Sequence, residues 1–243
     1  RKTERVAMMK IIVVIPTFYG NKDDIRYHLA LDSCREVSRC AGLLKAIIVD
    51  ASPSEDVRQA MREHGTDEEG NQHVRVVPQT IKGKKGAALR EGIALAAKEL
   101  ENDEDGIIAF QEPEKVDMVS HWKAVRELVL LTGADICVPK RSDSSFTETY
   151  PIEQYHSENF VNLYLDALAK AVDFPSVDWT IGPMAFKASL ANHWAAYEGD
   201  LWDMQLVPMV RAQRWHGAKV VTYDFDYHHP VSMKEEELGS PKW

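Results

Sequence analysis

Short runs of β-branched and other apolar residues alternate with segments of helical periodicity through the first half of this 243-residue chain. The apolar runs, which read as strands, cover residues 11–15, 46–49, 74–77, 106–110 and 134–138. Helices are expected over residues 23–40, 55–64, 86–100 and 116–132, the second of them capped by Ser54. This alternation is typical of parallel strands joined by crossover helices. It predicts an α/β fold with a Rossmann-like, doubly wound sheet, helices on both faces, and ligands beyond the carboxyl ends of the strands.

The second half of the chain has a different pattern. Residues 141–151 are polar and rich in Ser and Thr, which predicts a mobile loop. Helices are expected over residues 160–172, 187–194 and 206–215, and a late strand over residues 220–226. Because no internal repeat or low-complexity segment separates the halves, we predict one domain over residues 1–243. It comprises a first half at 10–140, a second half at 141–230 and a C-terminal tail at 231–243.

Composition narrows the range of functions. The chain has 38 acidic and 29 basic residues, a net charge of −9, which argues against a partner as rich in phosphates as nucleic acid. Cys34, Cys40 and Cys137 show none of the spacings that build zinc sites, and a reducing, cytoplasmic location is the simplest interpretation. The apolar runs are far shorter than the roughly 20 residues of a membrane-spanning helix, and residues 1–10 lack the apolar stretch of a secretory signal. We therefore expect no transmembrane segment.

Four segments in this chain resemble motifs of family-2-like GT-A glycosyltransferases, including the polyprenyl-phosphate sugar transferases. They are residues 11–18 (IIVVIPTF), 47–56 (IIVDASPSED), 84–93 (KKGAALREGI) and 178–186 (DWTIGPMAF). The resemblance runs from Lys10 to His229 and depends on the order and spacing of the segments. It implies a single GT-A domain with a mixed central sheet. It also implies transfer of a sugar from a UDP- or GDP-linked donor to a hydroxyl acceptor, which can be a saccharide, a lipid-linked molecule or a small molecule.

The resemblance also implies where the nucleotide sugar binds. The predicted donor-binding residues follow the strands and are Pro16, Thr17, Phe18, Asp50, Ser52, Lys84, Gly86, Arg90 and Gln111. Asp50 is expected to accept hydrogen bonds from the base, and the lysines and backbone amides before Gly86 suit a diphosphate. Each assignment has a structural alternative. Asp50 can favour a helix dipole, Lys84 can lie in a solvated loop, and Arg90 can pair with Glu91 or Glu101.

The turn after the fourth strand departs from the family pattern. GT-A enzymes usually carry a D-x-D motif there, whose carboxylates hold Mg²⁺ or Mn²⁺ against the diphosphate. In this chain Gln111 stands for the first Asp, and the second falls near Pro113. Glu112, Glu114 and the late His229 are the candidate ligands that remain, although His228-His229 can equally be an exposed strand end. A second possibility is that Lys115 supplies positive charge directly and makes the metal partly dispensable.

An acidic cluster at residues 198–203 supplies candidates for the catalytic base on the acceptor side. Asp203 aligns best with the family's acidic pair, and Asp200 is the alternative because Trp202 replaces the first member of that pair. Acidic residues in a first helical turn are also common as caps. Four aromatic residues are expected near the acceptor, where they either form a sugar platform or pack in the core: Trp179, Trp194, Tyr197 and Trp202. Residues 141–155 are expected to close over the donor.

Two other functions remain open at this point. A nucleotide-sugar-binding protein that has lost catalysis would explain Gln111 and Pro113 in the metal-binding turn. A nucleotidyltransferase has a similar alternation of strands and helices, but that class usually begins with a Gly-rich loop ending in Arg and Lys. The sequence after the first strand, Pro16-Thr17-Phe18-Tyr19-Gly20, is not such a loop.

Overall fold

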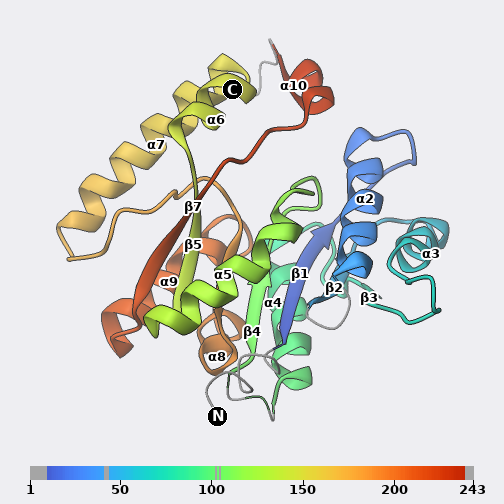
Figure 1. The fold of residues 1–243 in the computed structure, drawn as a ribbon, viewed down its shortest axis with the longest axis horizontal. Helices are drawn as coiled ribbons and strands as arrows, with labels where there is room; N and C mark the ends of the chain where they lie inside the picture. The colour runs from blue at the N-terminus through green and yellow to red at the C-terminus, as the bar shows by residue number, and fades with distance from the viewer. Residues whose placement is uncertain (1–9, 41–43, 102, 104, 239–243) are drawn as a thin grey trace.

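A mixed sheet forms the centre of the protein in this computed structural model, which describes residues 10–40, 44–101, 103 and 105–238. Its strands run in the order β3-β2-β1-β4-β6-β5-β7 (Figure 1). They are β1 (Ile11–Thr17), β2 (Leu44–Asp50), β3 (Val74–Pro78), β4 (Ile107–Phe110), β5 (Ile136–Arg141), β6 (Met184–Lys187) and β7 (Val220–Phe225). Only β6 runs antiparallel to its neighbours, β4 and β5. The carboxyl ends of β1, β2, β4 and β5 therefore lie along one edge of the sheet.

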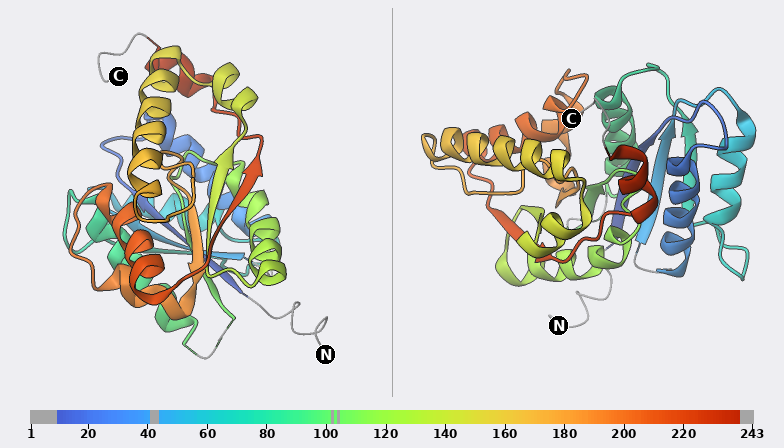
Figure 2. Two further views of the ribbon diagram at one scale, coloured as in Figure 1. Left: turned by 90° about the vertical axis from the view of Figure 1, so that its left-hand side faces the viewer. Right: turned by 90° about the horizontal axis from the view of Figure 1, so that it is seen from above.

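Helices cover both faces of this sheet (Figures 1 and 2). One face carries α2 (Ile25–Arg39) and α5 (Met118–Thr132), with α3 (Glu55–His64) packed beside α2. The other face carries α4 (Lys85–Glu99), α8 (Ala191–Ala195) and α9 (Asp203–His216). Beyond the carboxyl ends of the strands lie α6 (Asp143–Thr149), α7 (Ile152–Lys170) and α10 (Val231–Glu237), at the top of Figure 1. These three helices stand over the edge where ligands of doubly wound sheets bind.

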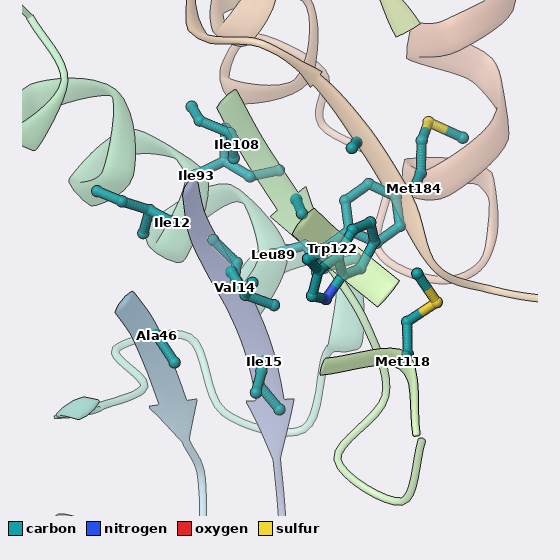
Figure 3. Close-up of a cluster of buried hydrophobic side chains, with 14 of the residues drawn as sticks. Ile12, Val14, Ile15, Ala46, Leu89, Ile93, Ile108, Met118, Trp122 and Met184 are labelled. Atoms are coloured by element: carbon teal, nitrogen blue, oxygen red, sulfur yellow. The ribbon is translucent and has the colours of Figure 1, made fainter. Parts of the chain in front are cut away.

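The core forms where the central strands meet α4 and α5. Every residue from Ile11 to Ile15 is buried, because β1 is a central parallel strand covered on both faces. Figure 3 shows the side chains that fill this region, with Leu89 of α4 and Trp122 of α5 among them. At Gly92 an added Cβ would lie 2.3 Å from Val14 Cγ1, so α4 lies directly on β1. Close packing thereby fixes the N-terminus of α4 beside the carboxyl end of β1.

The predicted α/β sheet with helices on both faces is confirmed, and the strands and helices of the first half lie within a few residues of their expected positions. For example, α3 spans the predicted residues, and Ser54 accepts a hydrogen bond from the Asp56 amide as its cap. The antiparallel β6 was not predicted as a strand; the helix expected over 187–194 starts after it, with a 3₁₀ turn (Ala188–Leu190) leading into α8. The helix expected from residue 160 begins eight residues earlier, as α7.

The predicted mobile loop at 141–151 was wrong, whereas closure of residues 141–155 over the donor stays a prediction. These residues form α6 and the start of α7, and the Ser and Thr residues are what stabilise the local structure. Ser142 accepts a hydrogen bond from the Ser145 amide at the helix start, and Thr149 Oγ1 donates to the Ser145 carbonyl. Phe146 is buried against Tyr150 with ring centroids 4.8 Å apart. Hydroxyl side chains cap helices as readily as they occupy loops, so composition alone misled the prediction.

The predicted C-terminal tail at 231–243 contains the short helix α10 up to residue 237, whereas residues 239–243 and 1–9 lie outside the described residues. Arg26 of α2 donates to Glu236 at 2.9 Å and to Glu237 at 2.7 Å, which ties α10 to the rest of the fold. No helix among the described residues is both long enough and apolar enough to cross a membrane.

Candidate functional site

A cavity of about 340 Å³ opens where β1, β2 and β4 end, and we call it the β1 cavity. It is lined by Pro16, Thr17, Phe18, Ala51, Gln79, Gly83, Lys84, Lys85, Ala88, Glu112 and Pro113. Four of the predicted donor-binding residues, Pro16, Thr17, Phe18 and Lys84, therefore lie together in one lining. Phe18 is 65% exposed, so its ring is available to stack on a flat ligand.

Asp50 lies at the end of β2, is buried, and precedes Ala51 of the β1 cavity lining. Its Oδ1 accepts hydrogen bonds from Thr17 Oγ1 at 2.8 Å and Ser52 Oγ at 2.7 Å. Its Oδ2 accepts from the Ser52 amide at 3.2 Å and from Arg58 Nη1 at 3.1 Å. Ser52 Oγ in turn accepts from the Tyr19 amide at 2.9 Å. The structure thus brings the predicted Thr17, Asp50 and Ser52 into one network, which holds the loops after β1 and β2 against each other.

The predicted phosphate-side residues Lys84, Gly86 and Arg90 contact the loop that precedes α9. The Gly86 amide donates to the Asp200 carbonyl at 2.8 Å, and a Cβ on Gly86 would lie 2.3 Å from the Gly199 carbonyl oxygen. Lys84 Nζ and Arg90 Nη2 each lie 3.5 Å from the Asp200 carboxylate. Arg90 also donates to the carbonyls of Tyr197 and Gly199. The alternative pairing of Arg90 with Glu91 or Glu101 is not among its contacts here, and Arg90 instead anchors this loop to α4.

A second cavity, of about 390 Å³, lies between α7, α9 and α10, and we call it the α7 cavity. Its polar lining comprises Glu112, Glu114, Lys115, Tyr150, Gln154, Glu158, Thr180, His229 and Glu237. Its apolar lining comprises Val161, Leu165, Trp179, Ile181, Trp202, Leu206 and Met233. Glu112 lines this cavity and the β1 cavity alike, so the two spaces meet at the turn after β4.

The residues of this turn, 111–115, are held by side-chain and backbone contacts. Gln111 is buried; its Oε1 accepts from Trp122 Nε1 at 2.7 Å, and its Nε2 donates to the Lys115 carbonyl at 3.1 Å. The Pro113 carbonyl accepts from Ser33 Oγ at 2.7 Å. Both polar atoms of the Gln111 amide are therefore hydrogen-bonded within the protein. Gln111 occupies the position where the glycosyltransferases that the sequence resembles carry the first Asp of the D-x-D motif.

Glu112 is the most enclosed carboxylate of the turn, at 8% exposure. Its Oε1 accepts from Lys85 Nζ at 2.7 Å and more weakly from Gln205 Nε2 at 3.4 Å, while Oε2 is buried without a protein partner. Gly182, at φ +92°, leaves the room that this carboxylate fills, since a Cβ there would lie 2.3 Å from Glu112 Oε2. Burial by itself would raise the pKa of Glu112, but Lys85 and Lys115 lower that pKa overall. Glu112 is thus held ionised at the junction of the two cavities.

Lys85 is the site residue that the sequence reasoning did not select. Its Nζ bonds to Glu112 and lies 3.7 Å from the ring centroid of Trp202. The signal was present, because Lys85 is the middle residue of Lys84-Lys85-Gly86 in the segment that resembles the family motif. Only the orientation of α4 shows that Lys85, rather than Lys84, reaches the turn after β4.

The predicted metal ligands Glu112, Glu114 and His229 all line the α7 cavity. His229 is buried, and its Nε2 lies 3.1 Å from Glu237 Oε2, while His228 is exposed. Burial and the nearby Glu112 raise the pKa of Glu114. Burial by itself would lower the pKa of Lys115, but Tyr150, Tyr227 and the two glutamates raise it overall, which keeps Lys115 cationic. Within the described part of the chain, no group of three or more His, Cys, Asp or Glu residues is arranged to hold a metal ion.

Asp203 and Asp200, the predicted base and its alternative, lie outside the lining of the α7 cavity. Asp203 begins α9, where Oδ1 accepts from the Leu201 amide at 3.0 Å and Oδ2 accepts from Tyr197 Oη at 2.9 Å. It lines a separate apolar groove between α7 and α9. Asp200 pairs with Lys84 and Arg90 as described above. Both carboxylates therefore have structural contacts, and their part in catalysis stays a prediction.

Two of the four predicted aromatic residues are positioned to meet a ligand. Trp202 is 57% exposed beside Lys85, and Trp179 lines the α7 cavity, where its Nε1 donates to Asp166 at 2.7 Å. Trp194 stacks on Phe186 with ring centroids 3.8 Å apart in the core, which fits the alternative of core packing. Tyr197 binds Asp203 through its hydroxyl.

An ion cluster of the buried Arg141 and Asp178 with Glu158 lies beside the α7 cavity. Arg141, at the end of β5, donates from Nε to Asp178 Oδ2 at 2.7 Å and from Nη2 to Asp178 Oδ1 at 2.8 Å. It also donates to Thr180 Oγ1 and Glu158 Oε2, both at 2.7 Å. Thr180 and Glu158 line the cavity. Arg141 thus joins α7 to the segment 178–182, whose Gly182 lies against the Glu112 carboxylate.

Comparison with known proteins identifies the fold. No protein-family model matches the chain, and no curated protein matches its sequence. Among solved structures, glucosyl-3-phosphoglycerate synthase of M. tuberculosis matches with a TM-score of 0.64 at 14% identity, over 94% of this chain and 76% of that one. The fold is of the GT-A type.

Two further solved structures show how widely this fold is shared. A mannosyltransferase from Pyrobaculum calidifontis, solved with GDP-Man and Mn²⁺, matches with a TM-score of 0.50 at 14% identity, over 88% of this chain and 55% of that one. A cytidylyltransferase from Leptospira borgpetersenii matches with a TM-score of 0.51 at 11% identity, over 90% and 77%. Because sugar and nucleotidyl transferases share the fold, function has to be argued from the site.

Proposed function

We propose that this protein transfers a sugar from a UDP- or GDP-linked donor to a hydroxyl-bearing acceptor. The observation that carries the proposal is the meeting of two cavities at Glu112. The β1 cavity, at the strand ends, is suited to the nucleotide, and the α7 cavity is suited to the acceptor. A transferase needs both substrates to reach one reacting carbon, and two cavities that share a lining residue provide that geometry. The predicted cytoplasmic location is part of this proposal.

In this proposal, the loops held by Asp50 form the nucleotide subsite. Phe18 stacks on the base from the exposed side, and the Thr17–Asp50–Ser52 network keeps the two loops at a fixed separation. The diphosphate lies toward Lys85 and Glu112, and the sugar extends into the α7 cavity beside Trp179 and Trp202. The acceptor hydroxyl then approaches from the α7 side, where a carboxylate takes its proton.

Two candidates for that base can be separated by experiment. Asp203 is the prediction from sequence, and Glu114 is the carboxylate of the turn that lines the α7 cavity. Asp203→Asn and Glu114→Gln are compared for donor binding and for transfer. The base is the residue whose substitution preserves donor binding and removes transfer, and Asp203 is excluded if Asp203→Asn retains full activity.

A non-catalytic nucleotide-sugar-binding protein is the second candidate, favoured by the commitment of the Gln111 amide to Trp122 and Lys115. Nucleotidyl transfer ranks lower, because the loop after β1 is not the Gly-rich loop of that class. Transfer itself distinguishes the first two, since a binding protein would be stabilised by donors without releasing nucleoside diphosphate in the presence of any acceptor.

The first experiment is a thermal-shift screen of the purified protein against UDP- and GDP-sugars and against CTP, with and without Mn²⁺. We expect at least one nucleotide sugar to raise the Tm, since a ligand at about 100 times its Kd stabilises a protein by roughly 2.7 kcal/mol. Asp50→Ala should abolish that shift, because the network between the two loops is lost. Failure of every nucleotide sugar to stabilise the protein would rule out the proposal, and stabilisation by CTP alone would favour nucleotidyl transfer.

A further inference from the structure

Lys85 brings a positive charge to the point where the two cavities meet. Its Nζ donates to Glu112 Oε1 at 2.7 Å and lies over the face of Trp202, 3.7 Å from the ring centroid. Lys85 lines the β1 cavity, whereas Trp202 lines the α7 cavity. Its ammonium therefore lies on the boundary between the two cavities.

The turn after β4 does not fit a divalent ion. Mg²⁺ prefers about six oxygen ligands in a regular arrangement, and carboxylates usually supply the charge. Here the Gln111 amide is bonded at both ends, and one oxygen of Glu112 is taken by Lys85. Lys115 adds a second cation beside Glu112 and Glu114. A dication would meet two ammonium groups at this turn, with no group of three acidic or His ligands among the described residues to hold it.

We propose that Lys85 binds the donor diphosphate in place of a divalent cation. This inference rests on the proposed function. In the ligand-free protein Glu112 is the partner of Lys85; when the donor binds, phosphate oxygens replace that carboxylate as the acceptor of the Lys85 hydrogen bond. Glu112 keeps its contact with Gln205 Nε2 and its enclosure by Gly182. After the exchange the Lys85 ammonium still has an anionic partner, and Lys115 remains as the cation near Glu112.

The other cations near the β1 cavity have different attachments. Lys84 lies 3.5 Å from Asp200, and Arg90 is bonded to the carbonyls of Tyr197 and Gly199. Those contacts hold the loop before α9 against α4. Lys85 differs from these cations because its partner, Glu112, also lines the α7 cavity. Displacement of Glu112 from Lys85 by a diphosphate therefore changes the contacts at the point where the two cavities meet.

The experiment measures binding of UDP and GDP by calorimetry, once with EDTA and once with Mn²⁺. We expect the wild-type protein to bind at least one diphosphate in EDTA, with Mn²⁺ changing the affinity by less than about twofold. Lys85→Gln should weaken diphosphate binding about 10- to 100-fold, the effect expected from loss of a charge-assisted hydrogen bond. Binding of the matching nucleoside should be unchanged, because it carries no phosphate.

Two further variants make the result specific. Lys82→Gln removes the same charge from the same loop at an exposed position outside the β1 cavity, and should alter binding less than about threefold. Glu112→Gln removes the carboxylate that competes for Lys85 and should tighten diphosphate binding severalfold in EDTA. A metal-ligand role for Glu112 predicts the opposite sign, namely weaker binding that is evident only with Mn²⁺.

The outcomes separate this inference from the proposed function. If the wild type binds diphosphates only with Mn²⁺, or if Lys85→Gln and Lys82→Gln behave alike, Lys85 does not replace a metal, and sugar transfer stands. Weaker binding by Glu112→Gln in EDTA would also overturn the exchange. If no diphosphate or nucleotide sugar binds under either condition, both the inference and the proposed function are wrong.

Discussion

Arg141→Met removes the guanidinium at the centre of the ion cluster beside the α7 cavity. The side chain of Arg141 is 1% exposed and that of its partner Asp178 is 5% exposed. Methionine approximates the aliphatic length of arginine but leaves Asp178 with only Asn162 and Thr180 as side-chain partners. The substitution therefore leaves a buried carboxylate without its counterion, while most of the packing volume is kept.

The expected loss follows from the burial of this pair. Removing one partner of a buried ion pair costs about 3–5 kcal/mol, because the remaining charge is left uncompensated. For a protein of this size, each kcal/mol lowers the Tm by about 2–4 °C. Arg141→Met should therefore lower the Tm by about 6–20 °C. The double variant Arg141→Met/Asp178→Asn should recover part of that loss, because the unpaired charge is gone.

Urea unfolding and calorimetry measure this loss, and an exposed pair of the same length is the control. Arg75 and Glu99 are also joined at 2.7 Å, but the Arg75 side chain is 52% exposed. Arg75→Met should cost less than about 1 kcal/mol. The reasoning is refuted if Arg141→Met costs no more than Arg75→Met, or if the double variant is less stable than Arg141→Met.

Three other predictions concern the site and its supports. Gly182→Ala places a Cβ against the Glu112 carboxylate and should reduce kcat/KM for transfer about 10-fold or more. Gly217 is the control, because it also has a positive φ, of +68°, but a Cβ there would meet nothing within 4 Å. Gly217→Ala should lower the unfolding free energy by about 1–2 kcal/mol and keep full activity. Gly86→Ala pushes the Gly199–Asp200 backbone away from α4 and should cost about 1–3 kcal/mol by urea unfolding, against less than about 0.5 kcal/mol for Gly20→Ala, whose added Cβ meets nothing. Burial by itself would raise the pKa of Asp178, but Arg141 lowers it overall. The pair therefore stabilises the fold above the unfolded pKa of about 4 and loses that contribution as the pH falls through the lowered folded value. Unfolding free energies measured against pH should decline more steeply on acidification in the wild type than in the Arg141→Met/Asp178→Asn variant.

The strands of the first half of the sheet could be predicted from the sequence because the central strands β1 and β2 are buried on both faces. Residues 11–15 and 46–49 are continuous apolar runs with no polar alternation, which leaves few structures other than central parallel strands. The antiparallel β6 was missed because its four residues, Met184–Lys187, are too short to show a period. The segment at 141–151 was misread because hydroxyl residues are common both in loops and at helix ends.

The candidate site was predicted in part, for a similar reason. Strand ends follow directly from strand positions, so the grouping of Pro16, Thr17 and Phe18 could be expected. The contacts of a charged side chain depend on helix rotation and on distant loops, which sequence spacing does not determine. Lys85 and Lys84 are adjacent in sequence, yet one reaches Glu112 and the other lies near Asp200.

The position of β6 between β4 and β5 has a consequence for how the chain folds during synthesis. Each of the strands β1 to β4 has at least one partner within this group, so that part of the sheet can assemble once residue 110 has emerged, although β4 also pairs with the later β6. By contrast, β5 ends at residue 141 and pairs only with β6 and β7, which begin at residues 184 and 220. Until then β4 and β5 present unpaired edges, which are templates for association with other chains. We therefore expect ribosome-bound chains that stop between residues 141 and 184 to be the species most in need of a chaperone.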